Sequence, residues 1–109
     1  MSTPDRHAED LRALAGLDKL IHEPGRLAVV SYLSVVEESD FLFLLDQTGL
    51  TRGNLSSHMA KLEEAGYVVV SKAFVDKTPR TTYRLTDRGR EAFNVYRKGL
   101  IESLGEMRT

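Results

Sequence analysis

The sequence contains no cysteine, which excludes disulfide bonds, zinc–thiolate sites and cysteine nucleophiles. No apolar stretch approaches the roughly 18 residues that a membrane-spanning helix requires. The first nine residues are polar and of mixed charge, and they lack the apolar segment of a secretory signal peptide. These absences favour a cytoplasmic protein without membrane association. The 109 residues suit one compact domain.

The net charge is small, but the charges are unevenly distributed along the chain. The whole chain carries −1 at neutral pH. Residues 51–90 hold eight basic and four acidic residues, a net charge of +4, and the remainder holds seven and twelve, a net charge of −5. Such a division is expected when one surface meets phosphate groups and the rest keeps the protein soluble. A chance fluctuation among so few charges is the alternative.

The first third of the chain has the periodicity of helices. Apolar residues recur every third or fourth position over 8–21, although Gly16 weakens that helix by about 1 kcal/mol and marks a break, after which Asp18 is a candidate cap for a restart. Pro24 suits the first turn of the next helix. The apolar run 26–36 contains several β-branched residues, which leaves a strand open, but its length and spacing favour a buried helix.

Two helices joined by a short turn follow. A polar turn ends at Asp40, which is a candidate cap for a short helix over 41–48. Gly49 stands where a left-handed residue ends a helix. Thr51 has the side chain of an N-cap for a second helix, and Gly66 ends that helix as Gly49 ends the first.

After Gly66 the residue pattern changes from one typical of helices to one typical of strands. Residues 67–70 and 81–85 are β-branched and aromatic, and they predict the two strands of a hairpin. Residues 75–80 between them are predicted to form an extended basic loop, too long for a tight turn. A last helix is predicted to begin near Thr86 and to carry an apolar stripe.

The second helix of the turn-linked pair has the composition of a helix that enters a DNA groove. Its apolar positions are spaced to face the core, and the opposite face carries polar donors with no large apolar side chain. Gly53 allows close approach, and free N–H groups at the helix start attract phosphate. Acids come only late, at Glu63 and Glu64. The candidate DNA-binding residues of this helix are Thr51, Arg52, Gly53, Asn54, Ser56, Ser57, His58 and Lys61.

The hairpin provides a second candidate surface for DNA. A hairpin with basic residues can reach an adjacent groove or its phosphates, and each phosphate contact makes binding depend on salt. Arg84 and Arg88 could extend this surface. The candidate residues of the hairpin are Lys72, Lys77, Thr78, Arg80 and Thr81.

Three segments resemble winged helix-turn-helix regulators of the ArsR and MarR type, in particular their small single-domain group. They are residues 17–27, residues 50–68 with the sequence Leu-Glu-Glu-Ala-Gly, and residues 77–90 with Pro-Arg-Thr-Thr-Tyr. The resemblance implies an α+β, mostly α fold with four helices, a two-stranded β wing and a C-terminal helix, which binds successive major grooves as a dimer. ArsR-type metal sensors carry a cysteine motif before the turn, and this chain has no thiol there.

The dimer prediction also has a physical basis in the two ends of the chain. The first and last helices carry apolar stripes that a monomer of this size would struggle to cover. Packing of the two stripes on each other within one chain is the alternative. We expect a dimerising helical extension over 1–16, a winged helix domain over 17–104 and a tail over 105–109. The candidate interface residues are Leu11, Leu14, Phe93, Tyr96, Leu100 and Leu104.

The sequence therefore predicts a nucleoid-associated transcription regulator that binds double-stranded DNA as a homodimer and acts as a repressor. The alternative is a winged-helix module for protein interactions, whose equivalent helix would usually carry apolar or acidic residues. No enzyme motif or cofactor site is predicted, and the three histidines lack metal-ligand spacing. A small-molecule effector stays open, and His58 is expected either to contact DNA or to pack.

Overall fold

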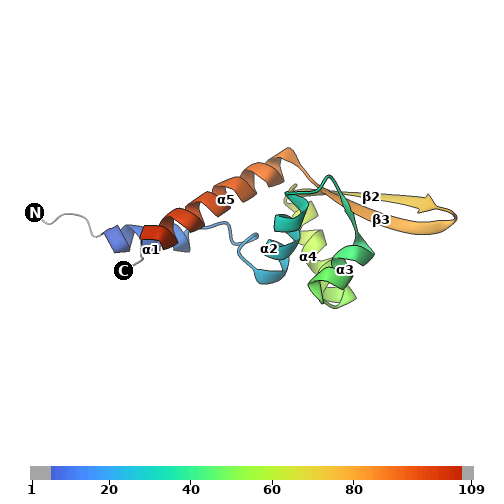
Figure 1. Ribbon diagram of the computed structural model, residues 1–109, viewed down its shortest axis with the longest axis horizontal. Coiled ribbons are helices and arrows are strands. Elements are labelled where there is room, and N and C mark those ends of the chain that lie inside the picture. The colour runs from blue at the N-terminus through green and yellow to red at the C-terminus, as the bar shows by residue number, and fades with distance from the viewer. Residues whose placement is uncertain (1–5, 107–109) are drawn as a thin grey trace, which may run out of the picture.

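The computed structural model describes residues 6–106 as five helices and a three-stranded antiparallel sheet (Figure 1). Residues 1–5 and 107–109 lie outside the described part. They include much of the segment tested for a signal peptide and most of the predicted tail. None of the described helices is long and apolar enough to cross a membrane. The elements are α1 (Arg6–Ala15), α2 (Pro24–Leu33), β1 (Ser39–Asp40), α3 (Phe41–Thr48), α4 (Arg52–Glu64), β2 (Val68–Val75), β3 (Thr78–Leu85) and α5 (Asp87–Glu106).

The helix boundaries follow the local chemistry of the chain. Asp40 and Thr51 accept hydrogen bonds from the backbone N–H three residues further on, at 2.7 and 3.1 Å, which satisfies groups that have no partner within the helix. Gly49 and Gly66 follow α3 and α4 with φ of 70° and 79°, the left-handed region that glycine tolerates. The caps and helix ends predicted at these four positions are confirmed.

Asp18 caps a turn and not the helix that the sequence predicted. Helix α1 ends at Ala15, as Gly16 indicated, but the chain becomes helical again only at Pro24. One carboxylate oxygen of Asp18 accepts from the N–H groups of residues 20 and 21, at 2.9 and 3.3 Å. The other accepts a hydrogen bond from the hydroxyl of Tyr67 at 2.5 Å. This long-range contact fixes the linker as a turn against the end of α4.

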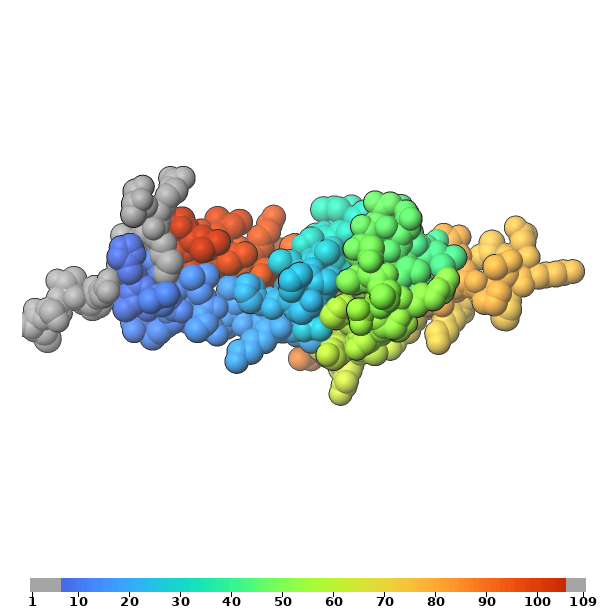
Figure 2. Space-filling model, turned by 90° about the horizontal axis from the view of Figure 1, so that it is seen from below, coloured from blue at the N-terminus to red at the C-terminus, as the bar shows by residue number. Residues whose placement is uncertain are grey.

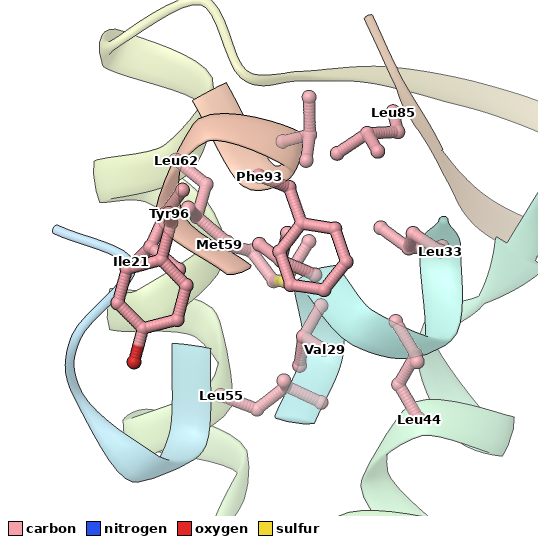
Figure 3. Close-up of a cluster of buried hydrophobic side chains, with 12 residues drawn as sticks. Ile21, Val29, Leu33, Leu44, Leu55, Met59, Leu62, Leu85, Phe93 and Tyr96 are labelled. Atoms are coloured by element: carbon pink, nitrogen blue, oxygen red, sulfur yellow. The ribbon is translucent and has the colours of Figure 1, made fainter. Parts of the chain in front are cut away.

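One hydrophobic core lies between α2, α3, α4, the first part of α5 and the inner half of the sheet (Figure 3). The predicted helix over 26–36 is confirmed, although it starts at Pro24 and ends at Leu33. Tyr96 also donates or accepts a hydrogen bond with His22 at 2.7 Å, which attaches α5 to the linker before α2. The buried cluster consists of Ile21, Val29, Val30, Leu33, Leu44, Leu55, Met59, Leu62, Val68, Leu85, Phe93 and Tyr96.

Two of the residues predicted to form a dimer interface belong to this core. The side chains of Phe93 and Tyr96 are 8% and 2% exposed within the single chain. They point into the cluster that Figure 3 draws. Because they have almost no surface to offer a partner, their assignment to an interface is corrected here. The apolar stripe of α5 is continuous in sequence, but its first half packs within its own chain.

The hairpin is longer and its turn tighter than the sequence predicted. Val75 pairs with Thr78, and only Asp76 and Lys77 lie between the strands. Both have positive φ, 51° and 68°, as a two-residue turn that matches the twist of the strands requires. The predicted extended loop over 75–80 is therefore wrong. Residues 71–80 are all exposed, so the outer half of the hairpin lacks the alternation of apolar and polar residues that reveals a strand.

The sheet contains a third strand that was not predicted from the sequence. Ser39 and Asp40 form β1 and pair antiparallel with β3, opposite Tyr83 and Thr82. The order in the sheet is β1-β3-β2, so β3 is central at the base of the hairpin. A strand of two residues is too short to show a periodic pattern. Its place in the polar segment 37–40 made a turn the natural expectation.

The molecule is elongated, with extents of 70 × 26 × 21 Å. Its radius of gyration is 17.1 Å, whereas a compact domain of this length is expected near 13 Å. Figure 1 shows the reason: the hairpin projects at one end, and α1 lies along α5 at the other. We call this pair of helices the arm. The core sits between the hairpin and the arm.

Candidate nucleic-acid interface

Helix α4 presents a polar face that the core does not use. Leu55, Met59 and Leu62 are at most 1% exposed and hold the helix against the core. The residues between them turn outward, so that α3 and α4 form the prominent face of the molecule seen in Figure 2. Of the predicted DNA-binding residues of this helix, those with exposed side chains or backbone are Thr51, Arg52, Gly53, Asn54, Ser56, Ser57 and Lys61.

Gly53 has no packing role within the described structure. A Cβ atom at this position would meet no atom within 4 Å. A glycine inside a helix costs about 1 kcal/mol relative to alanine, so the fold alone gives no reason for it. Close approach of a partner's surface to the first turn of α4 is a reason, as predicted from the sequence.

His58 differs from its neighbours on α4 because it packs within the chain. Its side chain is 17% exposed and lies against the start of α2. A guanidinium nitrogen of Arg26 lies 2.9 Å from Nδ1 of His58, and the carboxylate of Glu23 lies 3.4 Å away. Arginine only donates, so Nδ1 of His58 is the acceptor in the shorter contact. A Cβ on Gly25 would come within 2.9 Å of Nε2, so glycine makes room for the ring.

Glu23 completes this cluster as the N-cap of α2. Its carboxylate accepts hydrogen bonds from the N–H groups of Gly25 and Arg26, at 3.0 and 2.9 Å. Burial alone would raise the pKa of Glu23, but the two backbone hydrogen bonds and the positive charge of Arg26 outweigh burial and lower the pKa. The carboxylate is therefore held ionised where α2 meets His58. The cluster fixes the position of α4 relative to α2.

The basic residues of the hairpin occupy different places along it. Lys77 lies in the turn itself, and Lys72 lies on β2 opposite Thr81. Arg80 is not at the tip: it donates to the carboxylate of Asp40 at 3.1 Å, which joins β3 to the start of α3. Lys72, Lys77, Thr78 and Arg80 are exposed, and Thr81 is half-buried.

A groove of about 600 Å³ separates the hairpin from the beginnings of α3 and α4. Arg52 enters it from α4 and Arg80 from β3, so residues far apart in sequence share one concave surface. Phe41 and Leu42 were not predicted to line it, because only the fold brings the start of α3 opposite the wing. The lining residues are Asp40, Phe41, Leu42, Arg52, Val75, Thr78, Pro79, Arg80 and Thr81.

Comparison with known proteins gives the family. Residues 26–104 match the family described as a winged helix DNA-binding domain. The chain belongs to this family. Over 78 residues it is 33% identical to the uncharacterized protein MJ0432 of Methanocaldococcus jannaschii, which covers 72% of this chain and 85% of that protein.

Solved structures agree with this assignment. A transcriptional regulator homologue from Pyrococcus horikoshii OT3 has a TM-score of 0.84 and 28% identity, covering 93% of this chain and 99% of that one. Sco3205 is a MarR family transcriptional regulator from Streptomyces coelicolor whose structure was solved in complex with DNA. It has a TM-score of 0.61 and 21% identity, and the match covers 96% of this chain and 66% of that one. Structural neighbours include both MarR and ArsR family regulators, which confirms the predicted resemblance. The family is described as DNA-binding, and these structural neighbours are named as transcriptional regulators or a homologue of one.

In a winged helix domain the two parts of the interface have general roles. Helices α3 and α4 form the helix-turn-helix pair, whose second helix is the one that enters a major groove. The β2–β3 hairpin is the wing. The groove between α4 and the wing brings the two predicted surfaces together on one side of the domain.

Proposed function

We propose that this winged helix protein regulates transcription by binding specific sequences in double-stranded DNA. The observation that carries the proposal is the polar face of α4, which is exposed and does not pack against the core. This face lies beside the basic wing, and the two share one groove. A helix built for protein contacts would usually expose apolar or acidic residues instead. Within the interface, the side chains of Arg52, Asn54 and Ser56 are suited to base edges, and Lys72, Lys77 and Arg80 to phosphates.

The arm supports the further proposal of a homodimer. Leu11 on α1 and Leu104 on α5 are 61% and 53% exposed, although both are large and apolar. The arm is thin, and the described chain has no further element to cover these side chains (Figure 1). A second copy related by a two-fold axis would cover them with the same surface. Leu14 and Leu100 are half-buried and would lie at its edge.

A dimer of this kind would act as a repressor by occupying a pseudo-palindromic site on the nucleoid and blocking polymerase. The division into a dimerising extension over 1–16 and a DNA-binding domain over 17–104 is part of this proposal. The boundary is supported by the end of α1 at Ala15. A small-molecule effector stays a prediction from the sequence.

Substitution of the two arginines of the groove tests the mode of binding. A duplex is first selected from random-sequence DNA with the full chain. Arg52→Ala should weaken binding to this duplex more than to unrelated DNA, by about 1–3 kcal/mol, because a base contact is lost. Arg80→Ala should weaken both alike and reduce the dependence on salt, because a phosphate contact is lost. Affinities are measured by fluorescence anisotropy across a salt series.

Lys98→Ala is the matched control, because it removes an exposed positive charge from α5, on the arm. It should change neither affinity nor salt dependence. Failure of the selection to enrich any sequence would contradict sequence-specific binding. Equal losses for both arginine variants on both duplexes would contradict the separate roles of base and phosphate contact.

A further inference from the structure

The outer half of the wing carries an apolar pair with no partner in the fold. Phe74 on β2 is 77% exposed, and its cross-strand neighbour is Pro79 on β3, which is also exposed. The strands extend past the core at this point, so neither side chain covers anything buried. An aromatic side chain left in water at the end of a ribbon contributes nothing to the stability of the domain.

The register of the hairpin determines which way this pair faces. Successive residues of a strand alternate between its two faces, so Phe74 shares a face with Val68 and Val70. Val68 is buried in the core, and this face therefore looks toward the helices. Figure 1 shows α3 and α4 on that side of the hairpin, with the tip extending beyond them. Pro79, the cross-strand partner of Phe74, also lines the groove between the wing and α4, which places the pair beside the DNA-binding surface of α4.

The surroundings of the pair have the charge that a DNA backbone attracts. Lys72, Lys77 and Arg80 lie on the same outer half of the wing, where Asp76 is the one acidic residue of the strands and turn over 71–80, and Arg80 also contacts Asp40 at the start of α3. The two-residue turn sets the ends of both strands without a flexible loop. An apolar centre bordered by cations on a rigid ribbon suits the minor groove, where phenylalanine and proline can insert between base steps while basic residues meet the phosphates.

We propose that Phe74, supported by Pro79, is a wedge that the wing presses into the minor groove next to the major groove occupied by α4. The wedge partly unstacks one base step and bends the duplex. This inference rests on the proposed function. It adds a source of sequence preference without hydrogen bonds to bases, because flexible pyrimidine–purine steps such as TA unstack more readily than stiff ones.

A fluorescent base analogue tests the wedge directly. 2-Aminopurine is placed at successive positions of the selected duplex under the wing, because its emission rises when it loses stacking. The wild-type protein should raise emission at one step and bend the duplex in a fluorescence energy transfer assay. Phe74→Ala should lose both signals and bind about tenfold more weakly, whereas Phe74→Leu should retain part of them.

Val69→Ala is the matched control, because Val69 is an exposed apolar residue of the same strand on the opposite face. It should behave as the wild type. Replacing the TA or CA step under the wing by a stiff step should weaken the wild-type protein and leave Phe74→Ala unchanged. Unaltered emission and bending with Phe74→Ala, at wild-type affinity, would overturn the wedge and leave the pair as a surface for a protein. DNA recognition by α4 would survive that result, since Arg52→Ala tests it separately.

Discussion

Single residues in this chain decide how closely two backbones can approach. Gly89, in the first turn of α5, lies under the segment between α4 and β2, where a Cβ atom would overlap the carbonyl group of Tyr67. The carbonyl cannot move freely because it accepts a hydrogen bond from the N–H of Thr86. Gly53 is the opposite case, since nothing in the described structure fills the space beside it. Gly89 therefore allows close packing within the fold, whereas Gly53 leaves space at the surface.

Alanine at these two positions should act in opposite directions. Gly89→Ala should destabilise the protein by about 3 kcal/mol, because backbone must shift to admit the methyl group. Gly53→Ala should stabilise it by up to about 1 kcal/mol through helix propensity, yet weaken binding to the selected duplex. Urea denaturation measures the change in stability of both variants, and fluorescence anisotropy measures the change in DNA affinity. If Gly53→Ala bound DNA as tightly as the wild type, close approach at the start of α4 would not be its purpose.

Sequence inspection recovers residue roles that depend on near neighbours. The caps Asp40 and Thr51 act on N–H groups three residues away, so their side chains are sufficient evidence. His58 could not be assigned in this way. Its partner Arg26 is 32 residues distant, and only the packing of α4 against α2 brings them together.

Among the elements, the wing departs most from what its sequence suggested. Strands are recognised by alternation, which exists only where one face is covered, and the outer half of the wing has no covered face. Its turn is also atypical at the second position, since Lys77 adopts a backbone conformation that glycine usually provides. Helices α2 to α5 were predictable because each buries one face. Strand β1 was not, since it has two residues.

The turn of the wing offers a test that separates rigidity from charge. Lys77→Gly should stabilise the hairpin by up to about 1 kcal/mol, because glycine adopts a φ near 68° without the steric cost that lysine bears. The same change removes a charge from the wing, so binding to all duplexes should weaken and depend less on salt. Thermal denaturation and a salt series measure the two effects. Lys77→Ala is the control, since it removes the charge and keeps the steric cost; equal stability of the two variants would refute the argument.

At the scale of the whole molecule, a compact domain carries a projection at each end. The order of elements and the three resembling segments were enough to predict the fold. They could not show which neighbour covers an apolar stripe, and for that reason Phe93 and Tyr96 were placed at an interface instead of in the core. The exposed apolar residues of the arm remain the surface that we propose for a second copy.

A charge placed on the arm tests the homodimer. Leu11→Glu should shift the protein to a monomer in sedimentation at micromolar concentration, because a buried carboxylate would oppose the contact. Binding to a pseudo-palindromic duplex should fall by about 100-fold through loss of the second half-site, while binding to a single half-site persists. Val35→Glu is the control, since Val35 is 78% exposed but lies after α2, outside the arm. A wild-type protein that sediments only as a monomer would contradict the proposal.

The two-residue turn of the wing also limits how this hairpin can change in length. Adding one residue to a strand would exchange its two faces beyond that point, so that Phe74 on β2, or Arg80 on β3, would turn to the opposite face of the wing. Adding a pair of residues to each strand preserves both orientations and extends the reach by about 7 Å. Insertions and deletions in this hairpin should therefore be tolerated in even steps, and variants with odd steps should fold but lose the fit to DNA.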